Sequence, residues 1–259
     1  MEEARQYSAV REGWRPPRQR ALSPDGDEVK LCAVTAPPEL GFKLCRQSCG
    51  GNPMSNAFAA PLIEYWARLY ANVHPDDEAV RGRAPKELNF DYPPPAFIGD
   101  VGKARIFVLM GNGGYSDDTK NEFAGPGSAD LYRSKLANPA PADPRWTAPY
   151  YLTLGVLSEW LRSGRAAIVN ALAYRSLKTT NEVAKFAQIV PSAMFHRRWF
   201  EERLYPAAVA GEVRVAARRP RLWGLHGQPL AEANIWVLPS DHSARRLLSK
   251  EITDWLSRG

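Results

Sequence analysis

Three continuous apolar runs in the second half of the chain, each ending in polar residues, carry the main structural signal. The runs are ARIFVLM at 104–110, AAIVNALAY at 166–174 and ANIWVLPS at 233–240. Uninterrupted apolar sequence, part of it β-branched, is typical of strands buried on both faces of a sheet. We therefore expect three parallel strands here, and a further short strand at 212–216.

Helical patterns separate these runs. A helix is expected over about 149–163, where apolar residues recur on one face and Gly164 provides a good stop. A second helical region at about 180–205 is broken near Pro191, and an amphipathic helix closes the chain. Strands that alternate with helices predict an α/β fold with three layers, in which helices flank a central, four-stranded, mainly parallel sheet.

The N-terminal part of the chain has a weaker pattern. Residues 1–54 are rich in Pro, Gly and Arg and are expected to be irregular. From Ser55, apolar residues at helical spacing predict a packed helix that ends before Pro75. The proline-rich segment 91–100 cannot continue a helix or a central strand and predicts a rigid loop. We expect 1–96 to be an extension of the same globule and 97–259 to be the α/β core.

Composition and charge narrow the class of protein. No apolar run approaches the roughly 20 residues that cross a bilayer, and the N-terminus lacks the apolar segment of a secretory signal, so we expect a cytoplasmic monomer without membrane contact. The formal net charge of +6 favours a polyanionic partner such as nucleic acid; a basic surface that serves solubility is the alternative. Three cysteines do not suit a disulfide framework, and a zinc site that combines them with His74 would have unusual spacing.

The residues that end the three runs are the candidates for chemistry, because ligands of open parallel sheets collect at the carboxyl ends of the strands. The first run ends in GNGGYS from Gly111, the second contains Asn170, and the third ends in PSDHS from Pro239. Each segment also has a structural interpretation, respectively as a tight turn, a strand-end amide and a helix cap.

Taken in order, these segments resemble the active-site motifs of the uracil-DNA glycosylase superfamily, over roughly residues 97–250. MGNGG is similar to the family's Gly-x-(Asp or Asn)-Pro-(Tyr or Gly) loop, which puts Asn112 at the water-positioning residue. Gly113 then replaces the proline, and Gly114 takes the last position. IVNALAYRS resembles the strand whose asparagine reads the flipped base, which makes Asn170 the reader.

The third segment, VLPSDHSARR, resembles the family's His-Pro-Ser-Pro-like loop less closely. If the histidines are paired, His242 takes the catalytic position, and this is the register we prefer. If the Pro-Ser dipeptides are paired, Leu238 replaces the histidine and His242 lies near the residue that wedges into DNA. Arg246 or Leu247 is then a candidate for that wedge.

The resemblance implies a monofunctional DNA N-glycosylase, a hydrolase that flips a pyrimidine out of DNA and leaves an abasic site. Its catalytic residues would be Asn112 and His242. The implied substrate-binding residues are Gly111, Gly113, Gly114, Tyr115, Phe123, Asn170 and Ser240. The implied DNA-binding residues are Arg175, Lys178, Ser243, Arg245 and Arg246. No metal or cofactor is expected, since family members with an iron–sulfur cluster bind it through four cysteines and this chain has three.

The first motif also predicts the substrate. Family members strict for uracil have a tyrosine that collides with a C5 substituent, so Gly114 implies a pocket that admits a 5-modified pyrimidine at least as well as uracil. Gly113 in place of proline is expected to loosen the loop, and asparagine rather than aspartate at position 112 implies slow turnover. Repair of deaminated DNA and attack on foreign, modified DNA both remain open.

Two other functions are compatible with the sequence. One is a non-catalytic protein on the same fold that binds nucleic acid or another partner. The other is a nucleotide or nucleoside hydrolase or transferase in which the GNGG turn holds a phosphate, although that turn lacks the Lys and Ser/Thr order of a P-loop.

Overall fold

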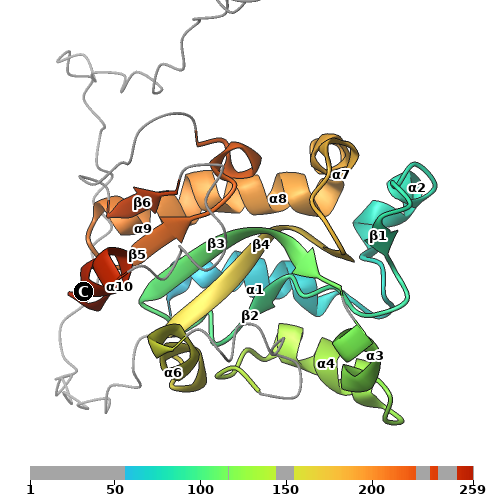
Figure 1. Cartoon of the computed structure of the whole chain (residues 1–259), viewed down its shortest axis with the longest axis horizontal. Helices are drawn as coiled ribbons and strands as arrows, with labels where there is room; N and C mark the ends of the chain where they lie inside the picture. The colour runs from blue at the N-terminus through green and yellow to red at the C-terminus, as the bar shows by residue number, and fades with distance from the viewer. Residues whose placement is uncertain (1–55, 116, 144–154, 226–233, 239–249, 259) are drawn as a thin grey trace, which may run out of the picture. The chain divides into compact units, whose positions relative to one another are not determined.

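The computed structural model describes residues 56–115, 117–143, 155–225, 234–238 and 250–258. The chain divides into two units, Met1–Cys49 and Gly50–Gly259, and all the described residues belong to the second. In this unit, helices and strands are arranged around one sheet (Figure 1), which confirms the α/β class. None of the helices described is long and apolar enough to cross a membrane.

The described part of the chain forms a six-stranded mixed sheet in place of the expected four-stranded one. Its strands are β1 (Leu88–Asn89), β2 (Phe97–Ile98), β3 (Ile106–Gly114), β4 (Ala166–Ser176), β5 (Arg214–Ala217) and β6 (Ile235–Val237). The order is β1-β4-β3-β5-β6, and β2 also pairs with β4. The pairs β4/β3, β3/β5 and β5/β6 are parallel, whereas β1 and β2 run antiparallel to β4. The sheet is larger than expected because two short segments before residue 100 add to the edge of β4.

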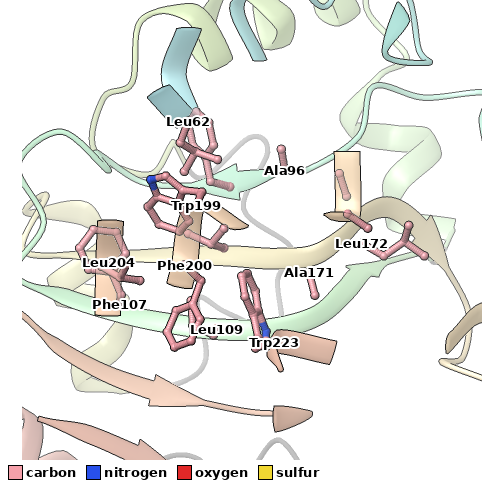
Figure 2. Packing of buried hydrophobic residues seen from close by; sticks show 14 of the residues in the cluster. Leu62, Ala96, Phe107, Leu109, Ala171, Leu172, Trp199, Phe200, Leu204 and Trp223 are labelled. Atoms are coloured by element: carbon pink, nitrogen blue, oxygen red, sulfur yellow. The ribbon is translucent and has the colours of Figure 1, made fainter. Parts of the chain in front are cut away.

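Alternation along the strands supplies two apolar clusters, one on each face of the sheet. Phe107 and Leu109 of β3 belong to the larger cluster, whereas Ile106 and Val108 belong to the smaller one. The larger cluster includes side chains from α1 (Ala60–Ala67), α8 (Pro191–Trp199), the π-helical segment η3 (Phe200–Leu204) and α9 (Tyr205–Val209). The smaller cluster includes side chains from α6 (Val156–Arg162) and α10 (Lys250–Ser257). Figure 2 shows how Trp199 packs beside Phe107 in the larger cluster, with 6.4 Å between ring centroids.

The helices lie close to where the sequence places them. The helix expected from Ser55 to just before Pro75 is shorter than predicted, since it consists of η1 (Ala57–Ala59) and α1 and ends at Ala67. Gly164, with φ of +75°, follows the end of α6. Pro191 separates α7 (Asn181–Phe186) from α8 and is the first residue of α8, where its missing N–H costs nothing. The remaining helices are η2 (Pro75–Asp77), α2 (Glu78–Arg81), α3 (Asp117–Glu122), α4 (Ser128–Ala137) and η4 (Pro220–Trp223).

The GNGG segment belongs to β3 and does not form a tight turn after it. β3 continues to Gly114, and its register with β4 shifts between Asn112 and Gly113. Such an irregularity redirects the side chains of a strand and is common beside functional sites. The strand thus runs from the buried core to the half-buried Asn112 and the exposed Gly114.

A buried histidine on α8 forms hydrogen bonds with both α1 and β4. His196 is fully buried, and its Nε2 accepts the indole N–H of Trp66 at 2.6 Å. Because indole can only donate, the ring proton is on Nδ1, which donates to the main-chain oxygen of Asn170 at 2.6 Å. Both contacts require the neutral imidazole, and burial lowers the pKa of His196 to about 4.

We expect His196 to make the protein less stable in mild acid. Its pKa of about 4 in the folded protein lies below the ordinary value of 6.5, so the unfolded chain binds more protons between these pH values. The free energy of unfolding should therefore fall by up to ~1.4 kcal/mol per pH unit, on account of this group, as the pH drops through that window. Urea unfolding at about pH 7.5 and about pH 5 measures the effect in wild type and His196→Gln. The stability gap between the two proteins should narrow at the lower pH, and a gap independent of pH would contradict the assignment.

Candidate functional site

The carboxyl end of β3 is a topological switch point. β3 has β4, the next long strand along the chain, on one side and β5 on the other. Ligands of α/β proteins bind where connections leave to opposite sides of a sheet. Gly111 and Asn112 lie at this end of β3. Arg219 follows β5 in the sequence, and a Cβ built on Gly111 would lie 3.1 Å from Cγ of Arg219. The first of the segments selected from the sequence therefore lies at this switch point, while the third, PSDHS from Pro239, lies outside the described residues.

Asn170 is a fully buried polar residue with one unmet hydrogen-bonding group. Its Nδ2 donates to the carbonyl of Pro95 at 2.5 Å, and its main-chain N–H donates to the carbonyl of Ala96 at 3.0 Å. The Oδ1 atom is buried and has no hydrogen-bond partner among the described residues. An unmet buried acceptor costs about 1–3 kcal/mol, so it marks a position where a ligand can supply the missing donor.

The half-buried side chain of Asn112 is held by the turn that follows β4. Its Nδ2 donates to Ser176 Oγ at 2.7 Å and to the carbonyl of Gly113 at 2.8 Å, while its Oδ1 accepts from the hydroxyl of Thr179. Ser176 donates its own proton to the carbonyl of Lys178 at 2.9 Å, so its oxygen must act as the acceptor toward Asn112. These partners fix the orientation of the amide and leave one lone pair of Oδ1 available for a water molecule.

The two asparagines lie on neighbouring parallel strands. The register pairs Asn170 with Met110 and Asn112 with Leu172. Asn112 is thus displaced two residues along β3 toward the carboxyl edge, where it is half-buried, while Asn170 remains in the interior. The structure brings together the two residues that the sequence singles out, at different depths of the same edge.

The proline-rich segment before β2 covers this edge of β4. Besides the contact of Pro95 with Asn170, the carbonyl of Pro93 accepts from Nε of Arg175 at 3.5 Å. Prolines have no N–H group, so the segment offers acceptors to β4 without burying donors that lack partners. Its rigidity is expected from the sequence, but its contact with the site residues is not.

Pro95 also explains why position 113 is a glycine. A Cβ on Gly113 would lie 2.3 Å from Cγ of Pro95, whereas nothing lies within 4 Å of a Cβ built on Gly114. The Pro95 ring thus fills the space beside Gly113. The expectation that this glycine loosens the loop stays a prediction. The neighbouring Gly114 is exposed and faces open space.

Arg175 is not on the surface, and its location does not fit the expected contact with a DNA phosphate. Its side chain is 4% exposed and pairs with Glu122 of α3 at 3.4 Å. The guanidinium also donates to the carbonyl of Gly114 at 3.3 Å and lies 5.5 Å from the ring centroid of Phe123. Arg175 thus ties β4 to the end of β3 and to α3.

The expected base-stacking residue, Phe123, is packed within the protein. Its ring stacks on Tyr92 with 5.4 Å between centroids and meets Tyr132 edge-on at 5.5 Å. Tyr115 lies 6.2 Å from Tyr92 at the margin of the same cluster. A base could stack on Phe123 only if one of these rings moved. Lys178 is exposed, which is compatible with the expected contact to DNA.

Part of the expected site lies outside the described residues. This part comprises Ser240, His242, Ser243, Arg245 and Arg246, together with Leu247 and the three cysteines. His74 uses both ring nitrogens within the protein, since Nδ1 accepts from the N–H of Asp76 at 3.3 Å and Nε2 donates to the carbonyl of Tyr65 at 3.0 Å. In this arrangement it has no lone pair for zinc.

Sequence reasoning missed Ser176 and Thr179, which orient Asn112, and Glu122, which neutralises Arg175. The two hydroxyl residues directly follow the Asn170 strand in the sequence YRSLKTT. Small hydroxyl residues at the end of a strand are the available signal, because they commonly bond to nearby polar groups in turns. No comparable local signal marks Glu122, whose partner is 53 residues away.

The two adjacent glycines provide a matched pair of substitutions. Gly113→Ala should destabilise the protein by about 1–3 kcal/mol, because its methyl group overlaps the Pro95 ring. Gly114→Ala should change stability by less than about 0.5 kcal/mol, since its methyl group meets only open space. Thermal unfolding of both variants measures the difference. Equal stabilities would show that Pro95 does not constrain position 113.

Comparison with known proteins adds no family assignment. No protein-family model, no curated protein and no solved structure matches this chain significantly. The function is therefore inferred from the site residues and their geometry.

Proposed function

We propose that this protein is a DNA glycosylase with a uracil-DNA glycosylase-like fold, which flips a pyrimidine out of DNA and hydrolyses its N-glycosidic bond. The observation that carries the proposal is the unpartnered Oδ1 of Asn170 on β4, the strand that pairs with the one carrying the oriented amide of Asn112. One hydrogen of Asn170 Nδ2 is used by Pro95. The second hydrogen and the free Oδ1 form a donor and acceptor pair that complements a pyrimidine edge.

The proposed reaction uses the two asparagines for different tasks. A base must leave the stack before its bond to the sugar is accessible, and Asn170 binds it in the extruded position. As the C1′–N bond breaks, the base leaves with the electron pair and the sugar becomes oxocarbenium-like. Oδ1 of Asn112 holds the water whose oxygen bonds to C1′, and His242 donates a proton to the departing base. The proton that the water releases passes to solvent, from which His242 regains its own. The products are a free base and an abasic site.

The fold and the charge distribution support this proposal. Helices cover both faces of a sheet whose strands β4, β3, β5 and β6 are parallel, as in the three-layer fold of that family. Exposed cations follow the strands at the same edge, with Lys178 after β4 and Arg219 and Arg221 after β5. Cations in these positions can neutralise phosphates on either side of an extruded nucleotide.

Access to Asn170 requires movement. The residue is fully buried and the aromatic cluster around Phe123 is packed, so a base enters only when this edge opens. Enzymes commonly open and close their sites in this way to exclude water. Gly114, with open space beside it, lies where a C5 substituent of the base would be admitted under this proposal.

A non-catalytic nucleic-acid-binding protein is the second candidate, and one observation favours it. Both amide hydrogens of Asn112 bond within the protein, and its oxygen accepts from Thr179. These bonds also suit a purely structural asparagine. The phosphate-holding alternative has less support, because GNGG lies in β3 and the following helix, α3, begins with Asp117.

We expect the protein to cleave oligonucleotides that contain uracil or a 5-modified pyrimidine. Abasic sites are detected as strand breaks after alkali treatment of duplex and single-stranded substrates that carry uracil, 5-hydroxymethyluracil or modified cytosines. Asn112→Ala should lower the rate about 100-fold or more without loss of DNA binding, because the water is no longer positioned. Asn121→Ala, at an exposed position of α3, is the control. DNA binding without cleavage by the wild type would favour the non-catalytic protein.

Gly114→Tyr should change the choice of substrate. Nothing lies within 4 Å of a Cβ at position 114, and under the proposal a tyrosine ring there would collide with a substituent at C5 of a bound pyrimidine. Cleavage of 5-hydroxymethyluracil should fall at least about tenfold relative to uracil, while Gly114→Ala should keep both activities. If the ratio of the cleavage rates for 5-hydroxymethyluracil and uracil does not change, Gly114 does not determine specificity.

A further inference from the structure

An open groove lies between the segment that precedes β1 and the helix α7. Its volume is about 610 Å³, within the roughly 300–1,000 Å³ that ligand sites span. Both walls are attached to the end of β4, because Leu88 of β1 pairs with Ser176 and α7 follows the turn that holds Asn112. Figure 1 shows β1 and α7 at this end of the sheet. A molecule bound at the carboxyl edge of β3 and β4 can therefore extend into the groove.

Apolar side chains line both walls of the groove. Phe186 and Ile189 come from α7 and the turn after it, and Pro85 comes from the opposite wall. Phe186 is nearly buried, whereas Ile189 is 37% exposed. The lining positions 182, 185, 186 and 189 recur at helical spacing and so share one face. This face offers apolar surface against which a flat ring can lie.

Cations stand on both walls. Arg83 and Lys86 belong to the segment before β1, and Lys185 belongs to α7. All three are exposed, and within the described part of the chain their side chains form no hydrogen bond or ion pair. By contrast, the exposed Lys250 of α10 pairs with Asp254 at 2.6 Å. Cations on two opposing walls, with no carboxylate bound to them, suit an anionic chain that runs between the walls.

Two carboxylates, Glu87 and Glu182, also line the groove. They disfavour a partner that is only anionic, because like charges repel at close range. They can accept hydrogen bonds from exocyclic amino groups of bases, as carboxylates do from N4 of cytosine. A nucleotide combines an anionic phosphate, an apolar ring face and amino groups at the ring edge. Its ring face is accessible only when the nucleotide is unpaired and unstacked, so the groove suits a single strand.

We propose that this groove binds unpaired nucleotides next to the target base, with Arg83, Lys86 and Lys185 holding their phosphates. Proteins that bind single strands combine a cationic groove along the backbone with side chains on which bases stack. The proposal rests on the proposed function for the identity of the strand, and it adds that a single-stranded flank belongs to the preferred substrate. Lys178, exposed in the turn between β4 and α7, would continue the cations toward Asn112.

The test measures the affinity for single-stranded DNA as the flank is lengthened. Fluorescence anisotropy gives the Kd of Asn112→Ala, which should bind without cleaving, for oligonucleotides with uracil at one end and a flank on its 5′ or 3′ side. A flank on one of the two sides should tighten binding at least about tenfold and then reach a plateau. Arg83→Ala with Lys185→Ala should abolish this gain and lower the slope of log Kd against log salt by roughly 0.7 per cation.

Two further variants separate the groove from general surface charge. Arg203→Ala removes an exposed cation of η3 and should leave the gain unchanged. Ile189→Ala should reduce the gain for a flank of bases but not for a flank of abasic sugars, because only bases contact the apolar face. Unfolding temperatures show that each variant is folded at the temperature of the measurement.

The outcomes distinguish this proposal from the proposed function. A flank that adds no affinity in the wild type, a gain that the double variant keeps, or an equal loss in Arg203→Ala would overturn the role of the groove. Cleavage of uracil oligonucleotides with an affinity independent of the flank would overturn the groove alone. Binding that depends on the flank and on the two cations, without cleavage by the wild type, would support the groove and overturn the proposed glycosylase.

Discussion

The hydrogen bonds of Asn170 hold together parts of the chain that are distant in sequence. Burial of a polar residue costs free energy unless its groups are hydrogen-bonded. Three of the four hydrogen-bonding groups of Asn170 have partners in Pro95, Ala96 and His196, and only Oδ1 has none among the described residues. Pro95 is 75 residues from Asn170 in the sequence, and His196 is 26 residues from it. Through the bond from Trp66 to His196, the same network includes α1. The proline-rich segment, α1 and α8 are thereby placed around one point of β4.

Much of the core could be predicted because its signals are local. The continuous apolar runs identify β3, β4 and β6, and helical spacing identifies the helix around Trp66 and the division at Pro191. By contrast, β1 and β2 are two residues each and have no pattern of their own. They are strands because β4 offers an unpaired edge, and only the folded chain reveals which segment pairs there. The register shift after Asn112 likewise depends on the pairing of β3 with β4.

At the candidate site, residue type was more predictable than environment. The sequence selects Asn112 and Asn170, and the fold brings both to one edge of the sheet. It also selects Arg175 as a cation, but the burial of that side chain depends on Glu122 and on the carbonyls of Pro93 and Gly114. The charge of a side chain follows from its own residue type, whereas its exposure depends on residues distant in the sequence. The same reason explains why the fit of Pro95 against Gly113 could not be anticipated.

The contrast between Gly113 and Gly114 has a consequence for how such a protein can evolve. A side chain at position 113 would overlap the Pro95 ring. Mutations there destabilise the fold, so selection acts against them regardless of the substrate. Its neighbour lacks that restraint, so its codon can drift through many amino acids while the protein stays folded. Of these two positions, residue 114 is the one that can vary while the fold is kept. A library randomised at this residue would therefore contain few unfolded variants.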